Sequence, residues 1–253
     1  MNSPIFVHMD TTSNVVLSRG IQAKDFQRGL IHRPNNLLLL NPASLDGEFE
    51  NHTNLKIIKG SFAVEQFLQN MSKRRNNQDV RWIDFTDLTM IKELSALEIS
   101  ELLYLGHMKT HLHSPFFYKL QNNFVYFDLG DDLLRVYYRY IEEFYRILAK
   151  QITWIIYQEL NDQRPFFKRK PIEVSTLPID LVKDLRELLK DGLVFYFPKA
   201  KVTNKSFEIP LYAAEEAGLK LSQQTIKSKD FVGTLTYYPK QNKWELDAEE
   251  LYL

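Results

Sequence analysis

Short apolar runs separated by polar turns dominate the first third of the chain. Four runs have the length and composition of strands: Ile5 to Met9, Leu37 to Leu40, Leu55 to Lys59 and Arg81 to Phe85. A helical pattern over Ala63 to Ser72 lies between the last two, which predicts a βαβ element in a mixed, partly parallel sheet. The run Leu37 to Leu40 is continuous rather than alternating, which favours a strand covered on both faces.

A capping box predicts the start of a second helix. Ser95 is followed three residues later by Glu98, and apolar residues at helical spacing continue the pattern to about Lys109. Pro115 ends this pattern, and the aromatic run Phe116 to Phe127 predicts a strand or a hairpin.

The longest helical pattern, Leu133 to Leu160, contains neither glycine nor proline and is rich in aromatic residues. Its charged residues recur at intervals of three and four, which predicts one solvated stripe: Arg135, Arg139, Glu142, Glu143, Arg146 and Lys150. The same intervals continue to Thr153, Trp154 and Tyr157. The face therefore changes from charged to aromatic, and we expect the aromatic part to be an interaction surface covered by another domain, a second copy or a partner.

Prolines and basic residues mark a predicted linker at 163–170, because they disfavour helix continuation and favour solvent. The predicted fold class is α+β. An N-terminal α/β portion, 1–162, has the mixed sheet and the long aromatic helix, and a smaller α+β portion follows at 171–253. In that second portion we expect a helix over Ile179 to Lys190, ended by Gly192, and a hairpin that turns at 239–242.

Composition excludes several classes of protein. The 32 basic and 32 acidic residues cancel, so the chain as a whole does not attract nucleic acid or an anionic membrane. It has no cysteine, and therefore no disulfide framework and no thiolate nucleophile. The N-terminus lacks a signal-peptide pattern, and no apolar run approaches the ~20 residues of a membrane span. We expect a cytoplasmic protein that does not enter a membrane.

Histidines near the end of the second predicted helix are the first candidates for chemistry. His107 and His111 lie four apart on one helix face, and His113 follows just beyond. Three carboxylates come after the next predicted strand and would complete a divalent-metal site if the chain folds back: Asp128, Asp131 and Asp132. The competing interpretation is a favourable interaction of the histidines with the helix C-terminus.

A second candidate group lies where predicted strands end, at Asp10, Asn41 and Asp84. Ligands of open α/β sheets bind beyond strand ends, so Asp10 and Asp84 could hold a phosphate group or a magnesium ion. The competing interpretation is that these residues form turns and helix caps.

Two basic triplets, 73–75 and 168–170, offer contacts to nucleic-acid phosphates, with Phe166 and Phe167 as stacking platforms. Both triplets are short and the net charge is zero, so nucleic acid is not the expected partner.

No phosphate-binding glycine loop, dinucleotide fingerprint or serine-hydrolase elbow is present, so no motif decides whether the protein is an enzyme. The sequence favours a cytosolic protein that acts by binding, in protein interaction or regulation, with a homodimer or another protein as partner. One alternative is a metal-dependent enzyme, such as a hydrolase, that uses the histidine and aspartate cluster. The other is a nucleic-acid-binding regulator.

Overall fold

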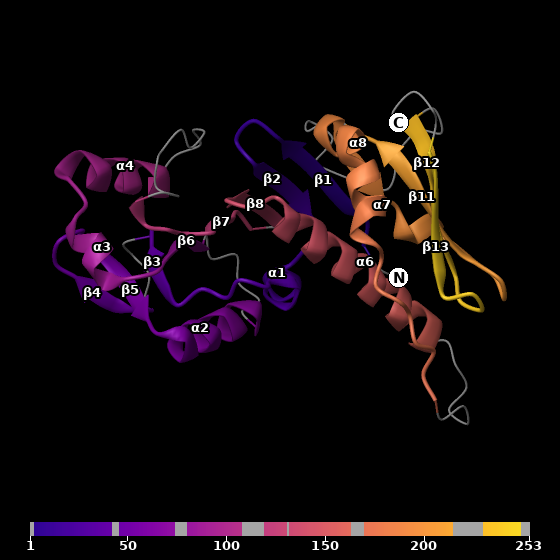
Figure 1. The fold of residues 1–253 in the computed structure, drawn as a ribbon, viewed down its shortest axis with the longest axis horizontal. Coiled ribbons are helices and arrows are strands. Elements are labelled where there is room, and N and C mark those ends of the chain that lie inside the picture. Colours follow the sequence, from indigo (N-terminus) through magenta and orange to yellow (C-terminus); the bar gives the residue numbers. More distant parts are fainter. Residues whose placement is uncertain are drawn as a thin grey trace. The chain divides into compact units, whose positions relative to one another are not determined.

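The computed structural model describes residues 3–41, 46–73, 80–107, 119–130, 132–162, 170–214 and 230–248. It confirms the mixed α+β class (Figure 1). The helices are α1 (Ala23–Gly29), α2 (Ser61–Lys73), α3 (Leu88–Lys92), α4 (Ala96–His107), α6 (Glu142–Asp162), α7 (Ile179–Asp184), α8 (Arg186–Asp191) and the 3₁₀ turn η1 (Phe197–Lys199). The strands are β1 (Ile5–Asp10), β2 (Val15–Arg19), β3 (Asn36–Leu39), β4 (Glu48–Glu50), β5 (Leu55–Lys59), β6 (Val80–Phe85), β7 (Phe124–Asp128), β8 (Leu133–Tyr138), β9 (Leu193–Phe195), β10 (Lys201–Val202), β11 (Phe207–Ala213), β12 (Phe231–Tyr238) and β13 (Lys243–Ala248). Within the described ranges, no helix combines the length and the apolar character needed to cross a membrane.

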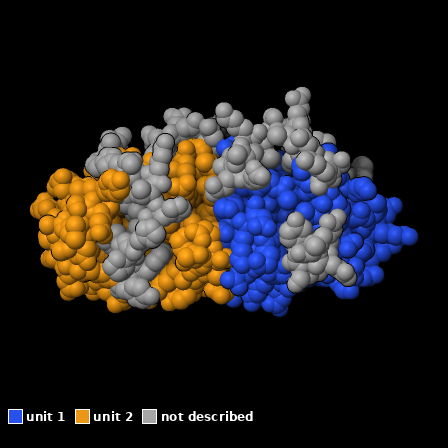
Figure 2. Space-filling view, turned by 90° about the horizontal axis from the view of Figure 1, so that it is seen from above, with its two compact units in different colours: residues 1–9, 18–21, 144–253 blue, residues 10–17, 22–143 orange. Residues whose placement is uncertain are grey.

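The chain forms two compact units, coloured separately in Figure 2. Unit 1 comprises residues 1–9, 18–21 and 144–253, and unit 2 comprises residues 10–17 and 22–143. Helix α6 therefore groups, from Phe144 onward, with the C-terminal elements. Of the predicted linker 163–170, only Lys170 is described, and a domain boundary there stays a prediction.

The sheet of unit 2 has the strand order β2-β8-β7-β6-β3-β5-β4. Strand β3 lies between β5 and β6 and is antiparallel to both. Strands β5 and β6 consequently point the same way, as a βαβ connection through α2 requires, but they are not neighbours. The prediction of a partly parallel sheet was wrong here, because β3, from earlier in the chain, inserts between the two predicted parallel strands.

Helices cover both faces of this sheet. Leu38 and Leu40 belong to a core that includes Ile91 of α3 and Leu102 of α4. On the other side α2 packs against β3 and β5 (Figure 1). Residues 37–40 are all buried, which confirms the predicted two-sided cover. An aromatic cluster centred on Phe26 of α1 contains Trp82, Phe124 and Tyr126, with ring centroids 5.0 to 6.0 Å from Phe26.

The predicted helix from Leu133 to Leu160 begins nine residues late, because its first part is strand β8. Strands β7 and β8 form an antiparallel hairpin that closes at Gly130, whose carbonyl accepts a hydrogen bond from Leu133 N. Leu134, Val136 and Tyr138 are buried. The chain then turns, and helix α6 starts at Glu142. The segment between β8 and α6 contains no glycine or proline, so the sequence pattern alone did not show that the helix begins only at Glu142.

Unit 1 contains the strand order β13-β12-β11-β9-β1, with β10 paired to β11. The pairs β11–β12 and β12–β13 are antiparallel, and the chain turns between β12 and β13 as predicted. The expected helix over Ile179 to Lys190 is divided into α7 and α8, and α8 ends at Gly192. Gly192 has φ +99°, and an added Cβ would lie 2.0 Å from the carbonyl oxygen of Ala214, so only glycine fits.

Candidate functional site

The predicted metal cluster falls largely outside the described residues. His111, His113 and Asp131 are not described, and His107 is described only as the last residue of α4. Asp128 Oδ1 accepts a hydrogen bond from Gly130 N at 3.0 Å, and Asp132 Oδ1 accepts one from Gln22 Nε2 at 3.4 Å. Among the side chains that the structure describes, no three histidine or acidic groups gather at a metal-binding distance. Metal binding by this cluster stays a prediction.

The carboxylates of Asp10 and Asp84 are both used within the fold. Asp10 accepts hydrogen bonds from Thr12 N at 2.9 Å and Ser13 Oγ at 2.6 Å, which close the turn after β1. Asp84 is 4% exposed and accepts hydrogen bonds from Asn123 N and Phe124 N, at 3.0 and 2.7 Å. Burial raises the pKa of Asp84 to about 7, against the effect of these two N–H donors. Asp10 thus has the geometry of the turn-forming interpretation, whereas Asp84 lies within β6 and holds the backbone at the start of β7. Binding of a phosphate group or a magnesium ion by either residue stays a prediction.

Of the basic triplets, only Lys170 has a described side chain, and it is exposed. Nucleic-acid contacts by these triplets therefore remain an untested prediction.

The predicted interaction face on α6 contacts another segment of unit 1. Thr153 Oγ1 donates a hydrogen bond to Ala149 O at 2.7 Å and accepts one from Leu177 N at 2.9 Å. About two turns further, Asn161 Oδ1 accepts a hydrogen bond from Ile172 N at 2.7 Å, and Asn161 Nδ2 donates to Ile172 O at 3.1 Å. The extended residues 171–178, which we call the strap, therefore run along α6.

The β12–β13 hairpin holds the middle of the strap. Ser175 N donates to Asn242 Oδ1 at 2.9 Å, and the indole nitrogen of Trp244 donates to Ser175 O at 2.9 Å. The hydroxyl of Tyr237 donates to the same Asn242 Oδ1 at 2.7 Å. The strap thus connects α6 with the hairpin through neutral polar groups.

Trp154 and Tyr157 remain at the surface beside the strap. Trp154 is 38% exposed, and its ring is stacked on that of Tyr157 with centroids 5.6 Å apart and planes 19° apart. The opposite side of α6 is buried through Leu148, Ile152 and Ile156. This fixed helix presents the two stacked rings, which we call the aromatic pair, as one rigid apolar surface.

The structure also brings together a histidine and a glutamate that the sequence did not connect, both in unit 2. Glu143, in the first turn of α6, was predicted on the solvated stripe, but its side chain is only 4% exposed. Its carboxylate accepts hydrogen bonds from Ile31 N and His32 N, both at 3.2 Å, and from His32 Nδ1 at 2.5 Å. The prediction for Glu143 was wrong because a loop 111 residues earlier covers this carboxylate. Local sequence carries no signal for such a pairing.

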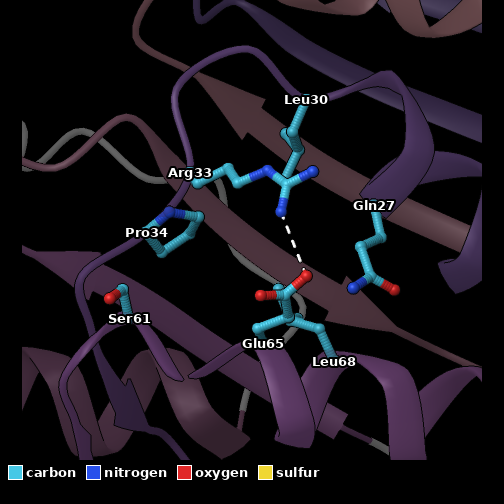
Figure 3. Close-up of a pocket in the computed structure, with 7 residues that line it drawn as sticks. All are labelled: Gln27, Leu30, Arg33, Pro34, Ser61, Glu65 and Leu68. Atoms are coloured by element: carbon cyan, nitrogen blue, oxygen red, sulfur yellow. Dashed lines mark hydrogen bonds and ion pairs between the residues drawn. The ribbon is translucent and has the colours of Figure 1, made fainter. Parts of the chain in front are cut away.

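A small hollow lies beside the same loop, as Figure 3 shows. Arg33 reaches from the loop toward Glu65 of α2, with Nη1 and Oε1 3.1 Å apart. The other lining residues are Gln27, Leu30, Pro34, Ser61 and Leu68. The cavity volume of about 50 Å³ is far below the roughly 300 to 1,000 Å³ of small-molecule sites. It has room for a few water molecules or one side chain.

Comparisons with known proteins do not assign this chain to a group: no family model, no curated protein and no solved structure matches it.

Proposed function

We propose that the protein acts by binding another protein and that the aromatic pair, Trp154 and Tyr157, is the centre of the contact. The observation that carries this proposal is the stacking of two partly exposed aromatic rings on a helix whose other side is buried. Tryptophan and tyrosine are enriched among residues that dominate binding energy, because they offer a large contact area with few rotatable bonds.

The surroundings support a preformed surface. The hydrogen bonds of Thr153 and Asn161 hold the strap along α6, so this part of the helix has little freedom to rearrange on binding. Lys150 precedes Trp154 by one turn and lies on the same face of α6. It places a charged residue next to the apolar centre, as protein interfaces commonly have at their rim.

A second copy of the chain is the partner to test first, because self-association is the commonest way to cover such a face. We expect the double variant Trp154→Ala/Tyr157→Ala to weaken self-association of the full chain by tenfold or more, equal to about 1.4 kcal/mol. Sedimentation over a concentration series measures this change. Arg146→Ala, an exposed position two turns away on α6, serves as the matched control and should leave association unchanged.

The proposal would be contradicted if wild type and the double variant associated equally. It would also fail if the double variant lost association only in proportion to a loss of folded protein, because the two residues would then be ordinary packing residues.

A further inference from the structure

The pair formed by His32 and Glu143 has the geometry of a reactive imidazole. A carboxylate oxygen is only an acceptor, so the short contact at 2.5 Å requires the hydrogen to lie on His32 Nδ1. In the neutral ring the lone pair is then on Nε2. The side chain of His32 is 58% exposed, whereas that of Glu143 is 4% exposed. The buried glutamate therefore holds one ring nitrogen while the ring extends into solvent.

Several contacts fix the orientation of this imidazole. Glu143 also accepts hydrogen bonds from the backbone N–H groups of Ile31 and His32, so the carboxylate holds both the ring and the loop that carries it. The His32 ring lies 6.1 Å from the Tyr140 ring, at an angle of 41°. Burial raises the pKa of the neighbouring Tyr138 phenol, and the negative charge of Glu143 raises it further. The carboxylate therefore lies at the edge of a buried region.

We propose that His32 is a phosphoryl-accepting residue that reacts through Nε2 with a small activated phosphoryl donor, such as an acyl phosphate or a phosphoramidate. The Nε2 lone pair attacks phosphorus and forms an N–P bond. The P–O or P–N bond of the donor breaks, and its electron pair departs with the leaving group. The hydrogen on Nδ1 stays between His32 and Glu143, whose negative charge compensates the positive charge that develops on the ring. Nothing is oxidised or reduced.

The neighbourhood favours a phosphoryl group over a metal ion. Arg33 directly follows His32, and its ion pair with Glu65 is exposed, with side chains 68% and 46% accessible. Exposed ion pairs contribute little to stability, so the guanidinium can exchange Glu65 for a phosphoryl oxygen at small cost. A metal ion would require further ligands, and the described residues contain no group of three histidine or acidic side chains placed to hold one.

His52 provides a matched control within unit 2. Its Nε2 lies 2.7 Å from the carbonyl oxygen of Leu94. A carbonyl only accepts, so Nε2 of His52 carries a hydrogen and has no lone pair for attack. The two histidines therefore present opposite ring nitrogens.

The test is incubation of the full chain with potassium phosphoramidate, followed by intact mass measurement and ³¹P NMR. We expect one phosphoryl group on Nε2 of His32, added about tenfold faster than to any other histidine. His32→Gln should abolish this fast phase, and His52→Gln should leave it unchanged. Glu143→Gln, which keeps an oxygen acceptor for the loop N–H groups, should slow it by about tenfold or more while the protein stays folded.

Three results would overturn the proposal. One is modification spread evenly over the histidines, and another is modification of His32 at Nδ1. The third is an unchanged rate in folded Glu143→Gln, which would reduce the pair to a structural clamp of the loop. Circular dichroism of each variant separates a lost reaction from a lost fold.

Discussion

The two units use different chemistry to hold buried polar groups. In unit 2 the described buried polar residues include three acids, Asp25, Asp84 and Glu143. In unit 1 the buried polar residues that the structure describes are all neutral: Ser18, Gln151, Ser206 and Thr236. The strap of unit 1 is likewise held by hydroxyl, amide and indole groups.

This difference has a physical consequence. A buried carboxylate that accepts backbone N–H groups fixes a loop strongly, but its contribution changes with protonation. Neutral donors and acceptors hold a segment with bonds of about 1 kcal/mol each that do not respond to pH. We therefore expect unit 2 to be sensitive to pH and to loss of a single carboxylate, and unit 1 to be sensitive to neither.

The largest expected effect is the pH dependence that Asp84 confers. The ordinary pKa of an aspartate is 3.8, and that of Asp84 in the folded protein is about 7. Between pH 3.8 and pH 7 the folded state therefore binds more protons than the unfolded state. The free energy of unfolding therefore falls as pH rises from 4 to 7, by roughly 4 kcal/mol at 1.36 kcal/mol per unit. Urea unfolding over this range measures the slope.

Asp84→Asn should remove most of that slope, and an equal slope in the variant would contradict the assignment. Hydrogen exchange should localise the loss of stability at higher pH to β6 and β7 rather than to β11 and β12.

Glu98 affects stability in a different pH range, because the hydrogen bonds from Lys119 and Ser95 lower its pKa to about 2. Its stabilising contribution is lost only as pH falls below its ordinary value of 4.5.

Removal of the Glu143 carboxylate should have the next largest effect. Glu143→Ala leaves the N–H groups of Ile31 and His32 without this acceptor, and we expect a loss of about 3 kcal/mol in the free energy of unfolding. Glu142→Ala, at the adjacent exposed position, should stay within about 0.5 kcal/mol of wild type. Urea unfolding of both variants measures the two free energies of unfolding. Similar decreases for Glu143→Ala and Glu142→Ala would show that burial of Glu143 does not cause the loss of stability.

A smaller loss of stability is expected in unit 1, at the hydrogen bond between Thr153 and the strap. Thr153→Val keeps the shape of the side chain but removes the acceptor for Leu177 N, which should cost about 1 to 2 kcal/mol. Thr153→Ser keeps the hydroxyl and should recover most of the loss. The cost should be the same at pH 5 and pH 8, and a clear pH dependence would break the distinction between the two units.

The smallest stability effect is expected at the surface tryptophan. Trp154→Ala removes a partly exposed ring and its stack on Tyr157, at a cost of about 1 kcal/mol. Trp244→Ala removes a ring that is 5% exposed and bonded to Ser175 O, and should cost about 3 kcal/mol. Thermal unfolding measures the stability of both variants. Equal losses of stability would mean that Trp154 serves folding rather than binding.

Several features were predictable because they depend on residues close in the chain. The capping box is present, with Ser95 N donating to Glu98 Oε2 at 2.7 Å and Glu98 N donating to Ser95 Oγ at 3.4 Å. Gly192 ends α8, and 239–242 connects β12 to β13. Helix α2 spans the predicted segment with two residues more at its start and one at its end. Each of these features is stabilised within a few residues, so local sequence is sufficient.

Other features depended on the tertiary structure. The segment 133–138 had an aromatic, amphipathic sequence compatible with helix or strand, and pairing with β7 decided for strand. The insertion of β3 between β5 and β6 is a lateral order that sequence order does not encode. The contact of His32 with Glu143 joins a loop and a helix 111 residues apart. By itself, then, the sequence determined the α+β class, the helix caps and the turns. Packing decided which strands are neighbours, which charge is buried and which imidazole contacts a buried carboxylate, because burial and long-range hydrogen bonds form only when distant segments meet.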